Sequence, residues 1–140
     1  MLRRLAFAVF LAAASAEAAE TSPPAAVMDR HLAAYNARAL DDFMALFAPD
    51  AALFEFPDKL LAKGTAEIRK RYEARFAEPN LHVDIVSRMV MGDKVIDRER
   101  VRRTFPEGPG TWNLVAINEV KDGRVTRVWF IFGEQVLDKK

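Results

Sequence analysis

The sequence contains no cysteine, so the chain has no disulfide bond, no thiolate nucleophile and no lipid-modified cysteine anchor. It also has no excess charge of one sign, because 21 Lys and Arg residues are balanced by 20 Asp and Glu residues. A balanced chain has no field that would draw it to nucleic acid or to an anionic membrane surface. We therefore expect no nucleic-acid partner.

The motifs of several kinds of catalytic site are missing as well. His31 and His82 are the only histidines, and neither belongs to a His-x-x-His or His-x-x-Glu pair. This is not a metal-binding pattern. There is no Gly-rich phosphate loop and no serine-nucleophile motif. We expect neither a metal nor another cofactor.

The N-terminal residues have the pattern of a secretory signal peptide. Arg3 and Arg4 give a positive start, residues 5–14 are apolar, and residues 14–18 contain two overlapping Ala-x-Ala sites. The apolar run is too short for a membrane-spanning helix, and a short buried helix is the alternative. We expect cleavage of residues 1–18, export to the periplasm or cell exterior, and no stable membrane anchor.

The rest of the chain is predicted to form one domain. Residues 19–26 are expected to be a linker, residues 27–134 the domain and residues 135–140 a tail. The apolar content of 51% is sufficient for one hydrophobic core.

The first half of the domain has helical spacing. Met28, Leu32 and Tyr35 recur on one helix face, a second short helix is expected from Asp41 to Pro49, and residues 64–78 form a third. Between the last two, residues 51–56 are predicted to form a short strand.

The second half is rich in Val, Ile, Phe and Trp, as strands are. Strands are expected at residues 81–91, 94–105, 111–120 and 124–132, with a longer loop at 106–110. Helices followed by consecutive hairpins predict an α+β fold with a mainly antiparallel sheet.

Several stretches resemble the nuclear transport factor 2-like superfamily, which includes ketosteroid isomerases and SnoaL-like polyketide cyclases. They are Ala34-Tyr35-Asn36-Ala37, Ala45 to Ala51, Gly64 to Arg69 and Asp122 to Glu134. The resemblance implies a cone-shaped fold, with three helices packed on a curved sheet around a ligand pocket. It also implies a homodimer formed through the outer face of the sheet.

The resemblance implies three candidate catalytic residues. The isomerase base corresponds to Glu55, and its two oxyanion-stabilising donors correspond to His31 and Asn118. In the isomerases the base is an Asp, and the two donors to the enolate oxygen are a Tyr and a protonated Asp. All three positions differ here, although each keeps a polar group.

Each of these residues has a plain structural alternative. Glu55 lies between Phe54 and Phe56, and strand alternation can point it either into the pocket or to solvent. Burial would raise its pKa and make it a usable base. His31 can be a hydrogen-bond donor or a helix residue without chemistry, and Asn118 can bind an oxyanion or only backbone groups.

The strand at residues 94–105 carries both charges in alternation. Period two places Arg98 and Arg100 on one face and Asp97 and Glu99 on the other. If the arginine face lines the pocket, the ligand is a carboxylate or phenolate. If it faces outward, the arginines form ion pairs or a dimer surface.

The signal-peptide pattern predicts an exported domain, and the resemblance implies that it binds a small, largely apolar molecule. It is either a cofactor-free isomerase or cyclase that transfers a proton beside a carbonyl group, or a non-catalytic ligand-binding or dimerisation module. The residues expected to line the pocket besides Glu55, His31 and Asn118 are Tyr35, Phe54, Phe56, Tyr72, Arg98, Arg100, Trp112, Phe130 and Phe132.

Overall fold

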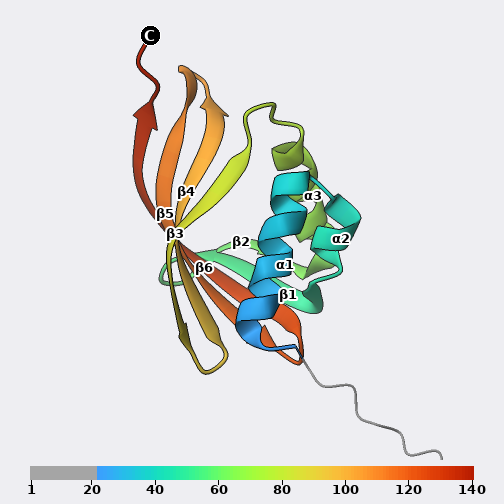
Figure 1. Cartoon of the computed structure of the whole chain (residues 1–140). Coiled ribbons are helices and arrows are strands. Elements are labelled where there is room, and N and C mark those ends of the chain that lie inside the picture. Colours follow the sequence, from blue (N-terminus) through green and yellow to red (C-terminus); the bar gives the residue numbers. More distant parts are fainter. Residues whose placement is uncertain (1–21) are drawn as a thin grey trace, which may run out of the picture.

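A computed structural model describes residues 22–140 as three helices and one six-stranded sheet (Figure 1). All three helices lie on the same side of a strongly curved sheet (Figure 1). This is the α+β architecture that the sequence predicts. The predicted signal peptide, residues 1–18, lies outside the described residues, so export stays a prediction.

The helices follow the predicted order, with different ends. They are α1 (Pro24–Ala37), α2 (Leu40–Met44) and α3 (Gly64–Phe76). A proline in the first turn starts α1, three residues inside the expected linker, and Arg38 ends it in the left-handed conformation with φ 56°. The second helix does not reach Pro49. The backbone oxygen of Leu46 already accepts a hydrogen bond from Val125 N at 2.8 Å, which directs the chain into the sheet.

The sheet has the strand order β2-β1-β6-β5-β4-β3. Only the pair of β1 and β6 is parallel; the other neighbours are antiparallel. The strands are β1 (Phe47–Glu55), β2 (Lys59–Lys63), β3 (His82–Met91), β4 (Lys94–Phe105), β5 (Gly108–Lys121) and β6 (Arg124–Leu137).

Four features of the sheet differ from the sequence-based expectation. Strand β1 begins at Phe47, four residues before the expected start at residue 51. The five-residue strand β2 was not expected, and it pairs with the end of β1. Strand β5 begins at Gly108 inside the expected loop, and β6 extends to Leu137 inside the expected tail. Cross-strand pairing extends both, because Gly110 lies opposite Leu137 in the register.

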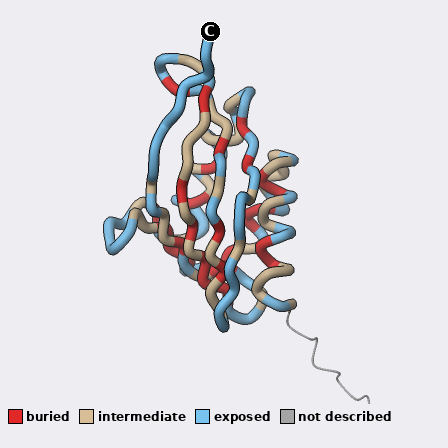
Figure 2. The backbone as a smooth tube through the Cα atoms, turned by 60° about the vertical axis from the view of Figure 1, so that its left-hand side comes forward, coloured by how far each residue is buried: buried red, intermediate tan, exposed pale blue. Residues whose placement is uncertain are grey.

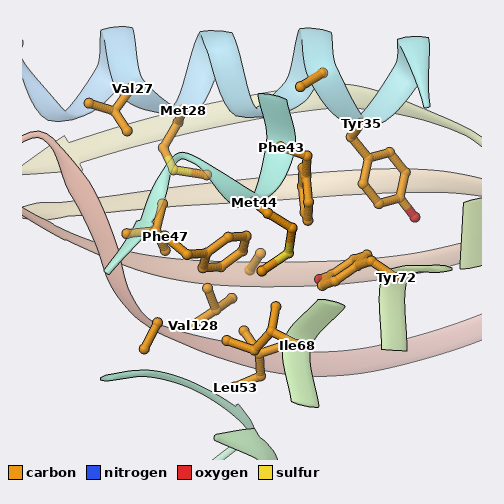
Figure 3. Close-up of a cluster of buried hydrophobic side chains, with 14 of the residues drawn as sticks. Val27, Met28, Tyr35, Phe43, Met44, Phe47, Leu53, Ile68, Tyr72 and Val128 are labelled. Carbon is orange, nitrogen blue, oxygen red and sulfur yellow. The ribbon is translucent and has the colours of Figure 1, made fainter. Parts of the chain in front are cut away.

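Figure 2 shows buried positions distributed along the strands between more exposed ones. The buried strand residues form one core cluster with the buried residues of the helices. The core lies between the inner sheet face and the helices, where Phe43, Leu53 and Ile68 are fully buried (Figure 3). Burying a side chain of this size contributes about 1.5–3 kcal/mol to stability. Among the described residues, no helix is long and apolar enough to cross a membrane.

Candidate functional site

A cavity opens between the helices and the inner face of the sheet. Its free space is about 730 Å³ when the open mouth is included, and about 70 Å³ of it is wide enough for the centre of a water molecule. A cavity of this width suits a small ligand, about the size of one substituted ring. The residues of the helical wall are His31, Leu32, Tyr35, Arg71, Tyr72 and Arg75.

The sheet supplies a mostly apolar wall that contains one carboxyl group. Leu114, Phe130 and Phe132 line the cavity, and Trp112 stacks on Phe132 with ring centroids 4.5 Å apart. The Trp112 indole N–H donates to the backbone oxygen of Gly133 at 3.0 Å, which fixes its ring. The carboxyl group in this wall belongs to Glu99.

Glu99 faces the cavity because of the register of β4. It lies opposite Leu114 on β5, and Asp97 lies opposite Ala116, so both acids share the inner face with these apolar residues. The carboxyl group of the half-buried Glu99 has no hydrogen bond or ion pair with any other residue in 22–140. Burial raises its pKa to about 8, the nearby Asp97 charge adds to the rise, and Arg88 opposes it.

The second acid on this face is neutralised. Asp97 is 1% exposed and receives two hydrogen bonds from Arg88, at 2.6 and 2.9 Å. The same guanidinium reaches Asp29 on α1 at 2.6 Å and thereby ties the helix to the sheet. Glu99 is therefore the acid in the cavity wall that is available to a ligand.

Two tyrosine side chains line the same cavity from the helices. Tyr35 and Tyr72 come from α1 and α3, and their rings meet edge to face with centroids 6.1 Å apart (Figure 3). Burial raises the pKa of Tyr72 to about 12 and also raises the pKa of Tyr35, and the charge of Glu99 contributes to both shifts. Both hydroxyls are therefore protonated donors near neutral pH, in the same cavity as the Glu99 carboxyl group.

His31 lies in the helical wall between the cavity and the aromatic core. Its ring contacts Phe43 at 4.4 Å and Phe47 at 5.4 Å between centroids. Burial lowers its pKa to about 3, and the positive charge of Arg88 contributes. Its Nε2 is buried without a hydrogen-bond partner among the described residues. His31 is thus a neutral imidazole at physiological pH.

Asn118 also lines the cavity, but its amide group is already engaged. Its Nδ2 donates to the backbone oxygens of Val95 at 3.1 Å and Ala116 at 3.4 Å. The same amide N–H group is not free to donate to a developing oxyanion. Of the two roles considered for Asn118, the one in which its amide binds only backbone groups therefore describes its hydrogen bonds best.

Glu55 does not line the cavity, which corrects its expected convergence with His31 and Asn118. The register places Glu55 beside Phe130, on the inner face, but at the far end of β1. Its side chain is 39% exposed, and its carboxylate lies 3.3 Å from the Lys59 ammonium group. The unexpected strand β2 brings Lys59 there, and the ion pair leaves Glu55 outside the apolar space.

Four other residues expected in the pocket lie elsewhere. Phe54 stacks on Trp129 at 5.9 Å on the outer face, and Phe56 is 53% exposed. Arg98 and Arg100 are exposed on the outer face. Since Asp97 and Glu99 take the inner positions of β4, strand alternation sends the arginines outward. Tyr35, Tyr72, Trp112, Phe130 and Phe132 lie in the cavity wall.

Sequence reasoning missed Glu99, Arg71 and Arg75 as site residues. The alternation of charges on β4 showed that either Glu99 or the arginines would face inward, but it could not decide between them. Arg71 and Arg75 flank Tyr72 on α3, a position that looks like an ordinary solvated helix face. Within residues 22–140, no group of three His, Asp or Glu side chains is arranged to hold a metal ion.

Comparison with known families shows to which family this architecture belongs. Residues 28–128 match the family model of the SnoaL-like domain. The chain belongs to the SnoaL-like family. Among curated proteins, no sequence matches it significantly.

Solved structures share the SnoaL-like fold. A cystatin-fold protein of uncharacterised function from Novosphingobium aromaticivorans is 25% identical, with a TM-score of 0.72 over 79% of this chain and 98% of that one. AclR from Streptomyces galilaeus, provisionally described as a hydroxylase, is 25% identical, with a TM-score of 0.67 over 79% and 88%. A protein from Sinorhizobium meliloti, provisionally described as a polyketide cyclase, is 26% identical, with a TM-score of 0.63 over 75% and 93%.

Proposed function

We propose that this SnoaL-like domain binds a small, largely apolar carbonyl compound and transfers a proton beside its carbonyl group, without a cofactor. The observation that carries the proposal is Glu99, an unpaired carboxyl group with a raised pKa in an apolar cavity. A carboxyl group with a pKa of about 8 can both accept and return a proton near neutral pH. Similarity to a protein that is provisionally described as a polyketide cyclase supports the same class of reaction.

The proposed step uses only residues of the cavity wall. The Glu99 carboxylate removes a proton from the carbon next to the carbonyl group. The electron pair of that C–H bond forms the C=C bond of an enolate, and the π pair of the C=O bond moves to the oxygen. Tyr72 or Tyr35 donates a hydrogen bond to the enolate oxygen. The proton held by Glu99 then returns to another carbon of the same ligand, so that the carboxylate is regenerated. Glu99 thus takes the role expected of Glu55, and the tyrosines that expected of His31 and Asn118.

The test is the conversion of 3-cyclohexenone into 2-cyclohexenone, followed by the ultraviolet absorbance of the conjugated product. Glu99→Gln keeps the shape of the side chain and removes the base, so the rate should fall at least about 100-fold. Glu73→Gln, an exposed change on α3, is the matched control and should retain the rate. For the wild type, the rate should rise with pH and level off above about pH 8, where Glu99 is ionised.

Two results would contradict the catalytic proposal. A loss of rate in Glu55→Gln with an active Glu99→Gln would place the base at the end of β1 instead. Binding of the ketone without turnover would favour a non-catalytic ligand-binding module. The stacked Trp112 and Phe132 support that second function, because they narrow the cavity with apolar surface and add no reactive group.

We also propose that the domain works outside the cytoplasm. The positively charged start, the short apolar run and the Ala-x-Ala sites support this location. The sequence contains no cysteine, so the domain depends on no disulfide bond, and this composition is compatible with an exported location.

A further inference from the structure

Two arginines of α3 stand at the opening of the cavity. Arg71 and Arg75 are one helical turn apart, so they project from the same helix face. Both line the cavity, and both also line an open hollow on the adjoining surface, whose other charged residues are Glu67, Lys70, Glu78 and Arg103. The Glu67 carboxylate there accepts a hydrogen bond from the backbone N–H of Lys63 at 2.7 Å. The two guanidinium groups therefore lie between the apolar interior and the solvent.

The positive charge at this opening is only partly neutralised. Glu78 lies 4.0 Å from Arg75 and 3.3 Å from Arg103, so one carboxylate serves two guanidinium groups. The Arg71 guanidinium group has no hydrogen bond or ion pair with another residue of the described part of the chain. The Arg75 and Arg103 side chains are each only 20% exposed, so water compensates little for the missing carboxylate.

The interior of the cavity does not supply the missing negative charge. Glu99 holds its proton for most of the time at pH 7, because burial raises its pKa to about 8. The Asp97 carboxylate is neutralised by its ion pair with Arg88, and His31 is uncharged. Arg71 and Arg75 line the cavity, and their positive charges oppose the rise in the pKa of the Tyr72 hydroxyl, so both charges act within the ligand space.

We propose that Arg71 and Arg75 bind a carboxylate group of the ligand while its apolar body occupies the cavity. The inference rests on the proposed function and narrows the substrate to small apolar acids that also carry a carbonyl group. Guanidinium groups suit this task because their fork of N–H donors matches the two oxygens of a carboxylate. The carboxylate would remain at the opening, and the reacting carbon would lie deeper, beside Glu99.

Binding of cinnamate and of cinnamamide, measured by isothermal titration calorimetry on the mature chain, tests this inference. The two probes have nearly the same shape, and only cinnamate is charged. The wild type should bind cinnamate about 10-fold more tightly, because charge-assisted hydrogen bonds are stronger than neutral ones. Arg71→Gln should remove most of this preference and leave the affinity for cinnamamide within about 2-fold.

Lys70→Gln is the matched control. It removes one positive charge from the neighbouring position of α3, which lines the outer hollow but not the cavity. It should leave the preference for cinnamate unchanged. Arg71→Lys keeps the charge without the fork of donors and should retain part of the preference, which separates carboxylate binding from a loss of folding.

Equal affinity of the wild type for both probes would overturn the inference. An equal loss in Lys70→Gln and Arg71→Gln would also overturn it, because a general surface field would then explain the preference. Failure of both probes to bind would contradict the ligand cavity itself. The cyclohexenone assay with Glu99→Gln tests the proposed function separately, because cyclohexenone has no carboxylate and its result does not depend on Arg71.

Discussion

Arg88 on β3 and Asp97 on β4 form a two-point ion pair on the inner face of the sheet, with Nε to Oδ1 at 2.6 Å and Nη2 to Oδ2 at 2.9 Å. Glu99 lies two residues along the same strand and face, without such a partner among residues 22–140. One cavity acid is therefore held in an ion pair, and the other is left for a ligand. The chemistry proposed for Glu99 depends on this difference.

Removal of Arg88 should destabilise the fold strongly. Arg88→Ala leaves the Asp97 carboxylate, whose side chain is 2% exposed, buried without a counter-charge. We expect a loss of about 3–5 kcal/mol in the free energy of unfolding, measured by urea denaturation. Arg98→Ala, an exposed arginine on the outer face, should change it by less than about 0.5 kcal/mol. Similar losses in both variants would contradict the structural role of the ion pair.

Replacement of His31 should stabilise the protein. His31→Leu removes a buried Nε2 without a partner and keeps an apolar side chain, so we expect a gain of about 1 kcal/mol at pH 7. The folded state lowers the His31 pKa from 6.5 to about 3, so the unfolded chain binds the extra proton between these values. Wild-type stability therefore falls as the pH decreases through this range.

The gain in the free energy of unfolding that His31→Leu has over the wild type should for that reason be larger at pH 5 than at pH 7. The increase is at most ~1.4 kcal/mol per pH unit below 6.5. Denaturation at both pH values checks this. His82→Leu, on an exposed strand position, is the control and should show little change at either pH. A constant effect of His31→Leu across this range would contradict the lowered pKa.

Glu99 should also make the stability of the fold depend on pH, but in the opposite direction, so that stability falls as the pH rises. The folded state raises its pKa from 4.5 to about 8, mainly through burial, so the folded chain keeps a proton that the unfolded chain has released. This contribution to stability is complete below pH 4.5 and declines as the pH rises toward 8. Glu99→Gln should therefore gain stability relative to the wild type between pH 6 and 8, by up to ~1.4 kcal/mol per pH unit. Parallel stability curves of the two proteins would show that Glu99 is not desolvated.

The outer face of the sheet is expected to form a homodimer. Ile131 is 43% exposed and Met89 is 54% exposed on this face, which also carries the stacked pair of Phe54 and Trp129. Such a surface is stabilised when a second copy covers it. Light scattering of the mature protein at micromolar concentration should give about twice the monomer mass, and Ile131→Lys should reduce it. A monomeric wild type throughout would refute this expectation.

Processing of the N-terminus should follow export. The exported chain should begin at Glu17 or Ala19, after one of the two Ala-x-Ala sites. N-terminal sequencing of protein from the periplasm or culture medium checks this. An intact Met1 on soluble cytoplasmic protein would argue against a signal peptide.

Much of the fold could be predicted from local patterns. The spacing of Met28, Leu32 and Tyr35 gives a helix, and runs of Val, Ile and aromatic residues give the strands, because these signals depend on neighbours in the chain. Strand β2 could not be predicted in this way. Its residues Lys59–Lys63 carry no strong strand pattern and form a strand because the end of β1 offers a partner.

The sequence by itself determined the family fold and several of the aromatic residues in the cavity wall, such as Trp112 and Phe132, through patterns that are local or shared across the family. Only the tertiary structure decided which face of β4 lies inside. The period of two places Glu99 and Arg98 on opposite faces of β4, but it does not determine which of the two faces is buried. Pairing with β5 and the contact of Arg88 with Asp29 on α1 turn the acids toward the helices. The proposed base is therefore Glu99 and not Glu55, because burial and charge pairing arise between elements that are distant in the sequence.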